Sequence, residues 1–378
     1  MSKEGKKKTI LSRIFTILKW IVIGFISFIF IAILLILLIR GIGKAINNKT
    51  PDGGINETMY VDINNSTQWI SIYGKDINNP VLLYLHGGPG AFTSYMDYKI
   101  FRKLSDVYTV VTWDQRDAGL STKNNENQID VPYTKELFMK DGVEMTKHLI
   151  NYLHTDKIVL FGHSWGTMLG TNLVLEHPEY YKYYVGAGQV IDPRENEKAL
   201  IEAAKKWTEN DEEGKNLLAK LDVNVSNEEA YMARTKILQR YGYDVLAEMP
   251  NFSITSAIFF NPYYSISDLY HLIKSFTSSE YSTKFNLFIS SPEFDKFSLL
   301  NRTEYQIPYY NINGDHDYQA NSFLAENYFN TVKASRKKLY KMKNMNHGVP
   351  LRSGEFSYYM HEIAELEQTF NSTTTIVN

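Results

Sequence analysis

The sequence of 378 residues contains no cysteine. Without thiols the chain cannot form disulfides, use a thiolate as nucleophile or bind zinc through cysteine. The cellular compartment stays open, because a protein without thiols works on either side of a membrane. The length predicts two domains, or one large domain with an insertion. Hydrophobic residues make up 44% and aromatic residues 14%, which favours an ordered, packed protein.

Residues 20–39, "WIVIGFISFIFIAILLILLI", contain no charged residue. A helix of this length spans about 30 Å, the thickness of a bilayer core. We therefore predict a transmembrane helix over 20–40, between a basic tail at 1–19 and a linker at 41–57. A cleaved signal peptide, with a shorter apolar region of about 7–15 residues, is the main alternative. A buried core helix is the other.

Charge is distributed unevenly along the chain. Residues 1–50 hold nine Lys or Arg and one Glu, a net +8, and the total of −2 leaves −10 for the remainder. So acidic a remainder is a poor nucleic-acid binder, because phosphate contacts supply most of that affinity. Six basic residues precede the apolar segment and three follow it. The positive-inside rule then predicts a cytoplasmic N-terminus and the bulk of the protein outside the cell membrane.

Apolar runs typical of strands alternate with helical stretches after residue 57. Near-continuous apolar strands separated by helices indicate an α/β fold, a mostly parallel sheet covered on both faces. Between 192 and 300 the pattern is amphipathic and helical, and we predict a helical cap there. It interrupts a core made of 58–191 and 301–378. The expected strands are 58–63 and 68–74 as a hairpin, then 81–86, 108–114, 158–163, 183–189, 308–314 and 337–344.

The stretch "FGHSWGTMLG" at 161–170 places Ser164 between two glycines, at the end of an apolar strand and the start of a helix. Side chains two residues before and after such a turn would collide, so Gly162 and Gly166 fit it. The turn exposes the hydroxyl beside the N–H groups that begin the next helix. We therefore interpret Ser164 as a nucleophile.

A serine nucleophile needs a base, and the base needs an acid to orient it. His347 lies in a loop after the last expected strand, where ligand-lining loops occur in parallel sheets. "NGDHDYQA" at 313–320 follows the preceding strand and offers Asp315 and Asp317 as the acid. A metal site made of these aspartates and His316 is the alternative interpretation.

An oxyanion hole needs a backbone N–H from a loop after another strand. "LHGGPGAF" at 85–92 fits, since Gly87 and Gly88 let the backbone approach a substrate without a Cβ in the way. A simple Gly/Pro turn is the alternative.

Three motifs together resemble the proline iminopeptidase-like branch of the α/β-hydrolases, over about residues 58 to 370. This resemblance implies the α/β-hydrolase fold with a helical cap. Asp117 departs from the family, which usually has glycine after the Arg of the DQR motif. The motifs are "HGGPG" (86–90), "WDQRDAGLS" (113–121) and "GHSWGT" (162–167).

The resemblance also implies roles for individual residues. Ser164 is expected to be the nucleophile, His347 the base and Asp317 the acid, since Asp317 ends a G-x-x-D pattern. Gly88 and Trp165 would supply the oxyanion amides.

Aminopeptidases of this family bind the substrate ammonium with glutamates of the cap. No motif selects among the candidates here, which are Glu202, Glu228, Glu229 and Glu248. We expect a membrane-anchored serine hydrolase without metal or cofactor that releases N-terminal residues, proline favoured, from short peptides. A carboxylic ester or other small-molecule hydrolase, and a ligand-binding sensor with low turnover, are the alternatives.

Overall fold

The computed structural model of the chain describes residues 3–125, 131–224, 227–245 and 254–376. These form two compact units, which are described separately. The first consists of Met1–Lys49 with Phe259–Tyr263, and the second of Thr50–Ile258 with Tyr264–Asn378.

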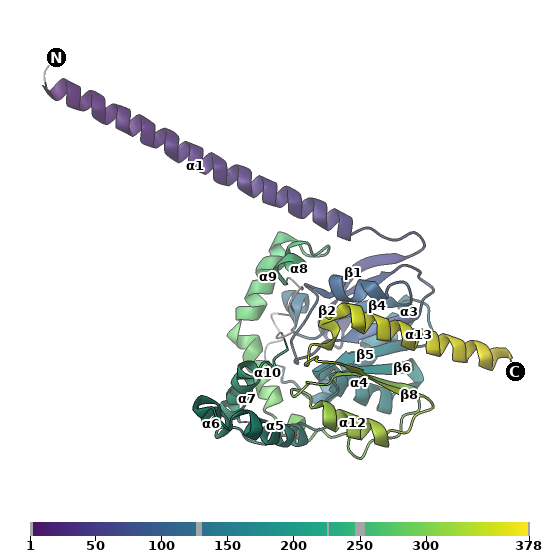
Figure 1. The fold of residues 1–378 in the computed structure, drawn as a ribbon. Helices are drawn as coiled ribbons and strands as arrows, with labels where there is room; N and C mark the ends of the chain where they lie inside the picture. The colour runs from purple at the N-terminus through teal and green to yellow at the C-terminus, as the bar shows by residue number, and fades with distance from the viewer. Residues whose placement is uncertain (1–2, 126–130, 225–226, 246–253, 377–378) are drawn as a thin grey trace. The chain divides into compact units, whose positions relative to one another are not determined.

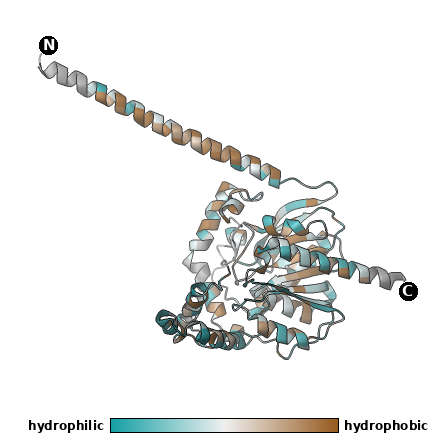
Figure 2. Ribbon diagram, viewed as in Figure 1, coloured by the Kyte–Doolittle hydropathy of each residue, from teal (hydrophilic) through white to brown (hydrophobic). Residues whose placement is uncertain are grey.

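The first unit is built on helix α1 (Lys3–Asn47). Its 36-residue stretch Ser12–Asn47 is long and apolar enough to cross a membrane. Figure 2 shows the hydrophobic colouring along most of this helix. The helix ends just before Pro51, which disfavours helical backbone in the residue before it. Strand β1 begins at Ile55, so the segment without regular structure is shorter than the linker predicted over 41–57.

The second unit contains a sheet of eight strands in its described residues, in the order β1-β2-β4-β3-β5-β6-β7-β8 (Figure 1). The β1–β2 and β2–β4 pairs are antiparallel, and every other pair is parallel. Each expected strand is present. They are β1 (Ile55–Ile63), β2 (Ser66–Gly74), β3 (Val81–Leu85), β4 (Thr109–Asp114), β5 (Ile158–His163), β6 (Tyr181–Ala187), β7 (Tyr309–Gly314) and β8 (Lys337–Met342).

Helices cover both faces of the sheet, and one series of helices is inserted after β6. The core helices are α2 (Asp97–Ile100), α3 (Lys135–Tyr152), α4 (Trp165–Glu176), α12 (Ser322–Thr331) and α13 (Ser353–Ile376), with short 3₁₀ turns η1 (Phe101–Leu104), η2 (Gly119–Asn124), η4 (Pro178–Tyr180) and η5 (Val349–Leu351). The inserted helices, called the cap below, are α5 (Pro193–Trp207), α6 (Glu212–Leu218), α7 (Glu228–Arg240), α8 (Ile254–Phe259), α9 (Ile266–Thr277), α10 (Ser279–Ile289) and α11 (Pro292–Asp295).

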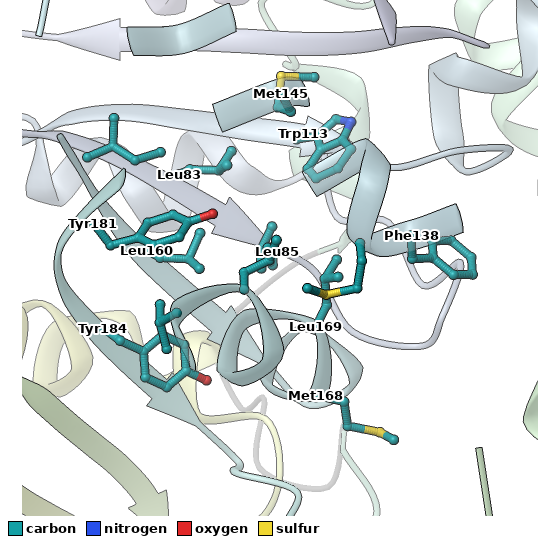
Figure 3. Packing of buried hydrophobic residues seen from close by; sticks show 14 of the residues in the cluster. Leu83, Leu85, Trp113, Phe138, Met145, Leu160, Met168, Leu169, Tyr181 and Tyr184 are labelled. Carbon is teal, nitrogen blue, oxygen red and sulfur yellow. The ribbon is translucent and has the colours of Figure 1, made fainter. Parts of the chain in front are cut away.

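Alternation along the strands produces one apolar core on each face of the sheet. On β3, Leu83 and Leu85 point into the core formed with α3, α4 and α12, part of which Figure 3 shows. Leu82 and Tyr84 point into the core formed with η1 and α13. With both faces buried, the carboxyl ends of the parallel strands are left as the edge at which a site can form.

Candidate active site

Ser164 occupies the one-residue turn between β5 and α4. Its backbone has φ 56° and ψ −122°, a strained conformation for a residue with a side chain. Two contacts hold the turn in place. The Ser164 N–H donates to the Ala187 carbonyl at the end of β6 (3.0 Å). The Thr167 hydroxyl donates to the Ser164 carbonyl (2.6 Å).

Both flanking glycines are required by close approaches of the backbone. A Cβ on Gly162 would lie 2.4 Å from the Gly166 carbonyl oxygen, so a side chain does not fit at this position. A Cβ on Gly166 would lie 2.0 Å from the Leu85 carbonyl oxygen. The turn therefore also packs against the end of β3, a contact that the sequence pattern does not reveal.

His347 and Asp317 form a buried pair, each only 1% exposed. His347 Nδ1 lies 2.8 Å from Asp317 Oδ2. The other carboxylate oxygen accepts the N–H groups of Gln319 and Ala320, both at 2.9 Å. Because an ionised carboxylate only accepts, the shared proton belongs on Nδ1, and Nε2 is left as an acceptor. That nitrogen is buried and has no hydrogen-bond partner in the described part of the chain.

The loop after β6 connects Ser164 to this pair. Ala187 accepts the Ser164 N–H, and the next residue, Gly188, touches His347 and Asp317. A Cβ at Gly188, where φ is +55°, would lie 2.8 Å from His347 Cε1. Ser164 and His347 make no hydrogen bond to each other in the described residues, and such catalytic bonds often tighten only with substrate. The sequence analysis missed Gly188, whose signal is the second glycine of "YYVGAGQ".

His163 supports the loop that carries His347. Its Nε2 lies 2.8 Å from the His347 carbonyl oxygen, and the two rings are 5.0 Å apart. Burial lowers the pKa of His163 to about 4, so the ring is neutral and its N–H donates. Asp315 is exposed, and its Oδ1 accepts the Met345 N–H (3.4 Å). Of the two aspartates considered as the acid, the structure brings Asp317 to His347.

Gln115 joins the three sequence motifs. Its N–H donates to His86 Nε2 and its side-chain amide to the His86 carbonyl, both at 3.2 Å. Its Oε1 accepts the indole N–H of Trp165, also at 3.2 Å. His86 Nδ1 in turn lies 2.8 Å from the Gly87 carbonyl oxygen. Burial lowers the pKa of His86 to about 4, which keeps the ring neutral and this network intact at neutral pH.

Gly88 and Trp165 line the same cavity as Ser164. Trp165 is the first residue of α4, so its N–H has no acceptor within the helix. A Cβ on Gly87 would lie 3.1 Å from the Ser164 Cβ, which puts the glycine loop in direct contact with the serine. Gly88 and Trp165, the two residues expected to supply oxyanion amides, therefore come from the ends of two different strands around one cavity.

The cavity at Ser164 has a volume of about 110 Å³ and includes a buried ion pair from the cap. Glu197 Oε1 accepts from Arg234 Nε at 2.8 Å and from the Asn196 amide at 3.4 Å. Arg234 also donates to the Gln319 carbonyl (2.8 Å). With Asp222, the charged lining residues sum to −1.

The glutamates proposed from the sequence do not supply this carboxylate. The side chains of the candidates Glu202 and Glu229 are both 70% exposed and pair with Lys205 and Lys220 on the surface, away from this cavity lining. The Glu228 side chain and Glu248 lie outside the described residues. Sequence reasoning missed Glu197, which lies near the start of α5, the first cap helix; nothing in its spacing separates it from Glu202.

Asp117 has a defined role in the loop where the related family usually has glycine. It keeps the positive φ (+56°) that glycine adopts easily. Its Oδ2 accepts from the Tyr133 hydroxyl (2.7 Å) and from Lys284 Nζ of α10 (3.0 Å). The substitution therefore ties the β4–η2 loop to the cap.

Metal ligation was the alternative interpretation of Asp315, His316 and Asp317. Within the described ranges, no three His, Cys, Asp or Glu side chains are grouped so that they could hold a metal ion. Asp315 and His316 are exposed, whereas Asp317 is buried against His347.

Comparisons with known proteins agree with this architecture. The chain is 34% identical over 151 residues to a Bacillus subtilis protein named "Probable aminopeptidase YbaC", covering 39% of this chain and 46% of that protein. It is 31% identical over 109 residues to a proline iminopeptidase of Lactobacillus helveticus (strain DPC 4571), covering 29% and 35%. These matches thus span less than half the length of either relative.

A solved structure extends the likeness in fold. The crystal structure of a proline iminopeptidase from Mycobacterium smegmatis superposes with a TM-score of 0.58 at 17% identity, over 83% of this chain and all of that one. The family model for the alpha/beta hydrolase fold matches residues 80–317, more than half of the chain. Together with the sheet order and the turn at Ser164, this match shows that the chain belongs to the α/β-hydrolase fold family.

Proposed function

We propose that the protein is a membrane-anchored serine aminopeptidase in which Ser164 is the nucleophile. The observation that carries the proposal is the buried His347–Asp317 pair, whose Nε2 has no hydrogen-bond partner in the described residues, together with the strained turn at Ser164. Asp317 holds the Nδ1–H tautomer, so Nε2 can take the Ser164 proton as the hydroxyl attacks a carbonyl carbon. Gly88 and Trp165 N–H groups stabilise the oxyanion.

The same groups complete the reaction. His347, now protonated on Nε2, donates this proton to the leaving amine, and an acyl-enzyme remains on Ser164. Water then loses a proton to His347 and attacks the ester, which releases the product acid and restores the serine. This sequence needs no group beyond the side chains and backbone amides described above.

The favoured substrate is a short peptide with a free N-terminus, often proline. Aminopeptidase and proline iminopeptidase names among the relatives support this class. Glu197 is the carboxylate placed to meet the substrate ammonium, and the net negative lining favours a cation. Glu197 already pairs with Arg234, so an ammonium would add a second cation to this carboxylate, and a blocked N-terminus would lose that charge-assisted contact.

Prolyl-p-nitroanilide and its N-acetylated form test the substrate class. We expect the free amine to be cleaved about 100-fold faster, which corresponds to about 3 kcal/mol of discrimination. Glu197→Gln should remove most of this preference, whereas the matched change Glu202→Gln on the surface of the same helix should keep it. Brisk hydrolysis of simple esters with no cleavage of free-amine peptides would establish the ester hydrolase alternative instead.

Membrane anchoring is supported by α1, whose apolar side chains are exposed along its length. The flanking charges orient it with the N-terminus in the cytoplasm. The hydrolase unit would then act on the outer side of the cell membrane.

A further inference from the structure

A second cavity, of about 170 Å³, lies next to the catalytic cavity but is not lined by Ser164 in the described part of the chain. The two cavities share Trp165, Met168 and Phe294 as walls. The second is otherwise enclosed by α3, α4 and the α10–α11 region of the cap. Figure 3 shows three of its apolar residues, Phe138, Met168 and Leu169.

Aromatic rings form most of its apolar wall. Phe138 and Phe288 each pack edge-on against Trp165 with ring centroids 5.3 Å apart. Phe294 stacks on Trp165 at 6.0 Å and 19°. Walls of this kind suit a single aromatic ring or a short branched chain. The volume agrees, since an apolar cavity of about 150 Å³ accepts benzene.

Basic residues outnumber acidic ones around this cavity. Lys135, Lys296 and Arg302 line it, against Glu293 alone. Glu176 lies outside the lining, with its Oε1 3.3 Å from Lys135 Nζ and 3.5 Å from Arg302 Nη2. Its negative charge offsets one of the positive charges of the lining. Lys296 forms no ion pair within the described ranges. Glu136 interacts with Glu293 and adds a further carboxylate nearby, so the excess of positive charge belongs to the lining residues themselves, which include three basic and one acidic side chain.

Two lining residues fix Arg302 and the cavity floor. Arg302 Nη1 donates to Asn172 Oδ1 (2.5 Å), and the Asn172 amide donates to the Met168 carbonyl (2.7 Å). Asn172 is itself 3% exposed. The guanidinium is thus held at the cavity, where a carboxylate can replace its long contact with Glu176.

We propose that this cavity binds a small monocarboxylate that carries one aromatic or branched apolar group. The ring would enter between Phe138, Phe288 and Phe294, and the carboxylate would face Lys296 and Arg302. The occupant would touch the ring of Trp165, and the backbone N–H of the same residue belongs to the proposed oxyanion site. Its binding is therefore coupled to the catalytic cavity. The binding itself does not depend on the reaction assigned to Ser164.

Calorimetric titration of phenylacetate into the full-length protein tests the proposal. We expect one site with a Kd on the order of 1 mM or tighter, as ligands of this size allow. Phenylacetamide has the same shape without the charge, so its Kd should be higher by about 10-fold or more. Ser164→Ala should bind phenylacetate as the wild type does, which separates this result from the fate of the proposed hydrolysis.

Variants locate the site. Ser298→Phe fills the cavity from its half-buried lining position and should abolish binding. Lys296→Gln, an exposed change with little structural cost, should weaken binding about 3-fold or more at low ionic strength, and Lys157→Gln should not. No binding to the wild type, equal binding of phenylacetamide, or unchanged binding in Lys296→Gln would each overturn the proposal.

Discussion

At the scale of single residues, the two neighbouring aspartates provide a matched comparison. Asp317 is buried against His347, whereas Asp315 is exposed. We expect Asp317→Asn to lower kcat by about 10⁴, because an amide at this position favours the wrong imidazole tautomer. Asp315→Asn should leave kcat within a few-fold of wild type. Steady-state kinetics on both variants decide this, and a larger loss in Asp315→Asn would reverse the assignment.

Asp114, the first residue of the DQR motif, predicts a pH effect on stability. Burial raises its pKa to about 8, partly offset by hydrogen bonds from the Leu120 N–H and the Ser94 hydroxyl (both 2.8 Å). Asp97 nearby is also buried, with its pKa raised to about 7. The pKa of such a carboxyl is higher in the folded state than in the unfolded state. Its contribution to the stability of the folded protein is therefore complete below the unfolded-state pKa and is lost as the pH rises through the folded-state pKa.

Asp114→Asn keeps the shape of the neutral acid and cannot ionise. The free energy of unfolding of the variant minus that of the wild type should therefore be larger at pH 8 than at pH 5. Urea unfolding at both pH values measures the difference. A difference that stays constant across this range would show that Asp114 is already ionised in the folded protein.

At the scale of elements, Arg116 joins the β1–β2 hairpin to α3. Its guanidinium pairs with Asp141 through two hydrogen bonds (2.7 and 2.8 Å) and donates to the Asn64 carbonyl (2.9 Å). Arg116 and Asp141 are 2% and 1% exposed. Arg116→Met leaves the carboxylate buried without its partner, which should cost about 3–5 kcal/mol of stability.

An exposed ion pair serves as the control for this variant. Lys198 and Glu195 on α5 are 56% and 41% exposed, so Lys198→Met should cost about 1 kcal/mol or less. Denaturant unfolding compares the two. If Arg116→Met were as mild as Lys198→Met, the pair would not hold the hairpin to the helix.

The elements were predictable from the sequence to different degrees. Strands such as β5 and the turn at Ser164 were predicted because apolar runs and flanking glycines act locally. The roles of Glu197 and Gly188 were not, because they depend on contacts with Arg234 and His347 more than thirty residues away along the chain. Helix α1 continues to Asn47, beyond the membrane span predicted over 20–40, because no proline interrupts residues 41–47.

At the scale of the whole molecule, the apolar helix α1 is the element on which the proposed location of the hydrolase depends. Six basic residues before the apolar segment against three after it predict that residues 58–378 lie outside the cytoplasmic membrane. Protease added to spheroplasts should digest this part of the chain. Protection that is lost only after lysis would reverse the orientation, and release of the intact domain into the medium would support a cleaved signal peptide.

The central claim is that Ser164 is a nucleophile activated by His347. A serine-directed fluorophosphonate followed by peptide mapping tests this most directly, because the reagent traps only an activated hydroxyl. We expect a single adduct at Ser164 in the wild type and none in Ser164→Ala, with both proteins showing the same thermal unfolding midpoint. An adduct that persists in Ser164→Ala, or a wild type that is folded but unlabelled, would contradict the account.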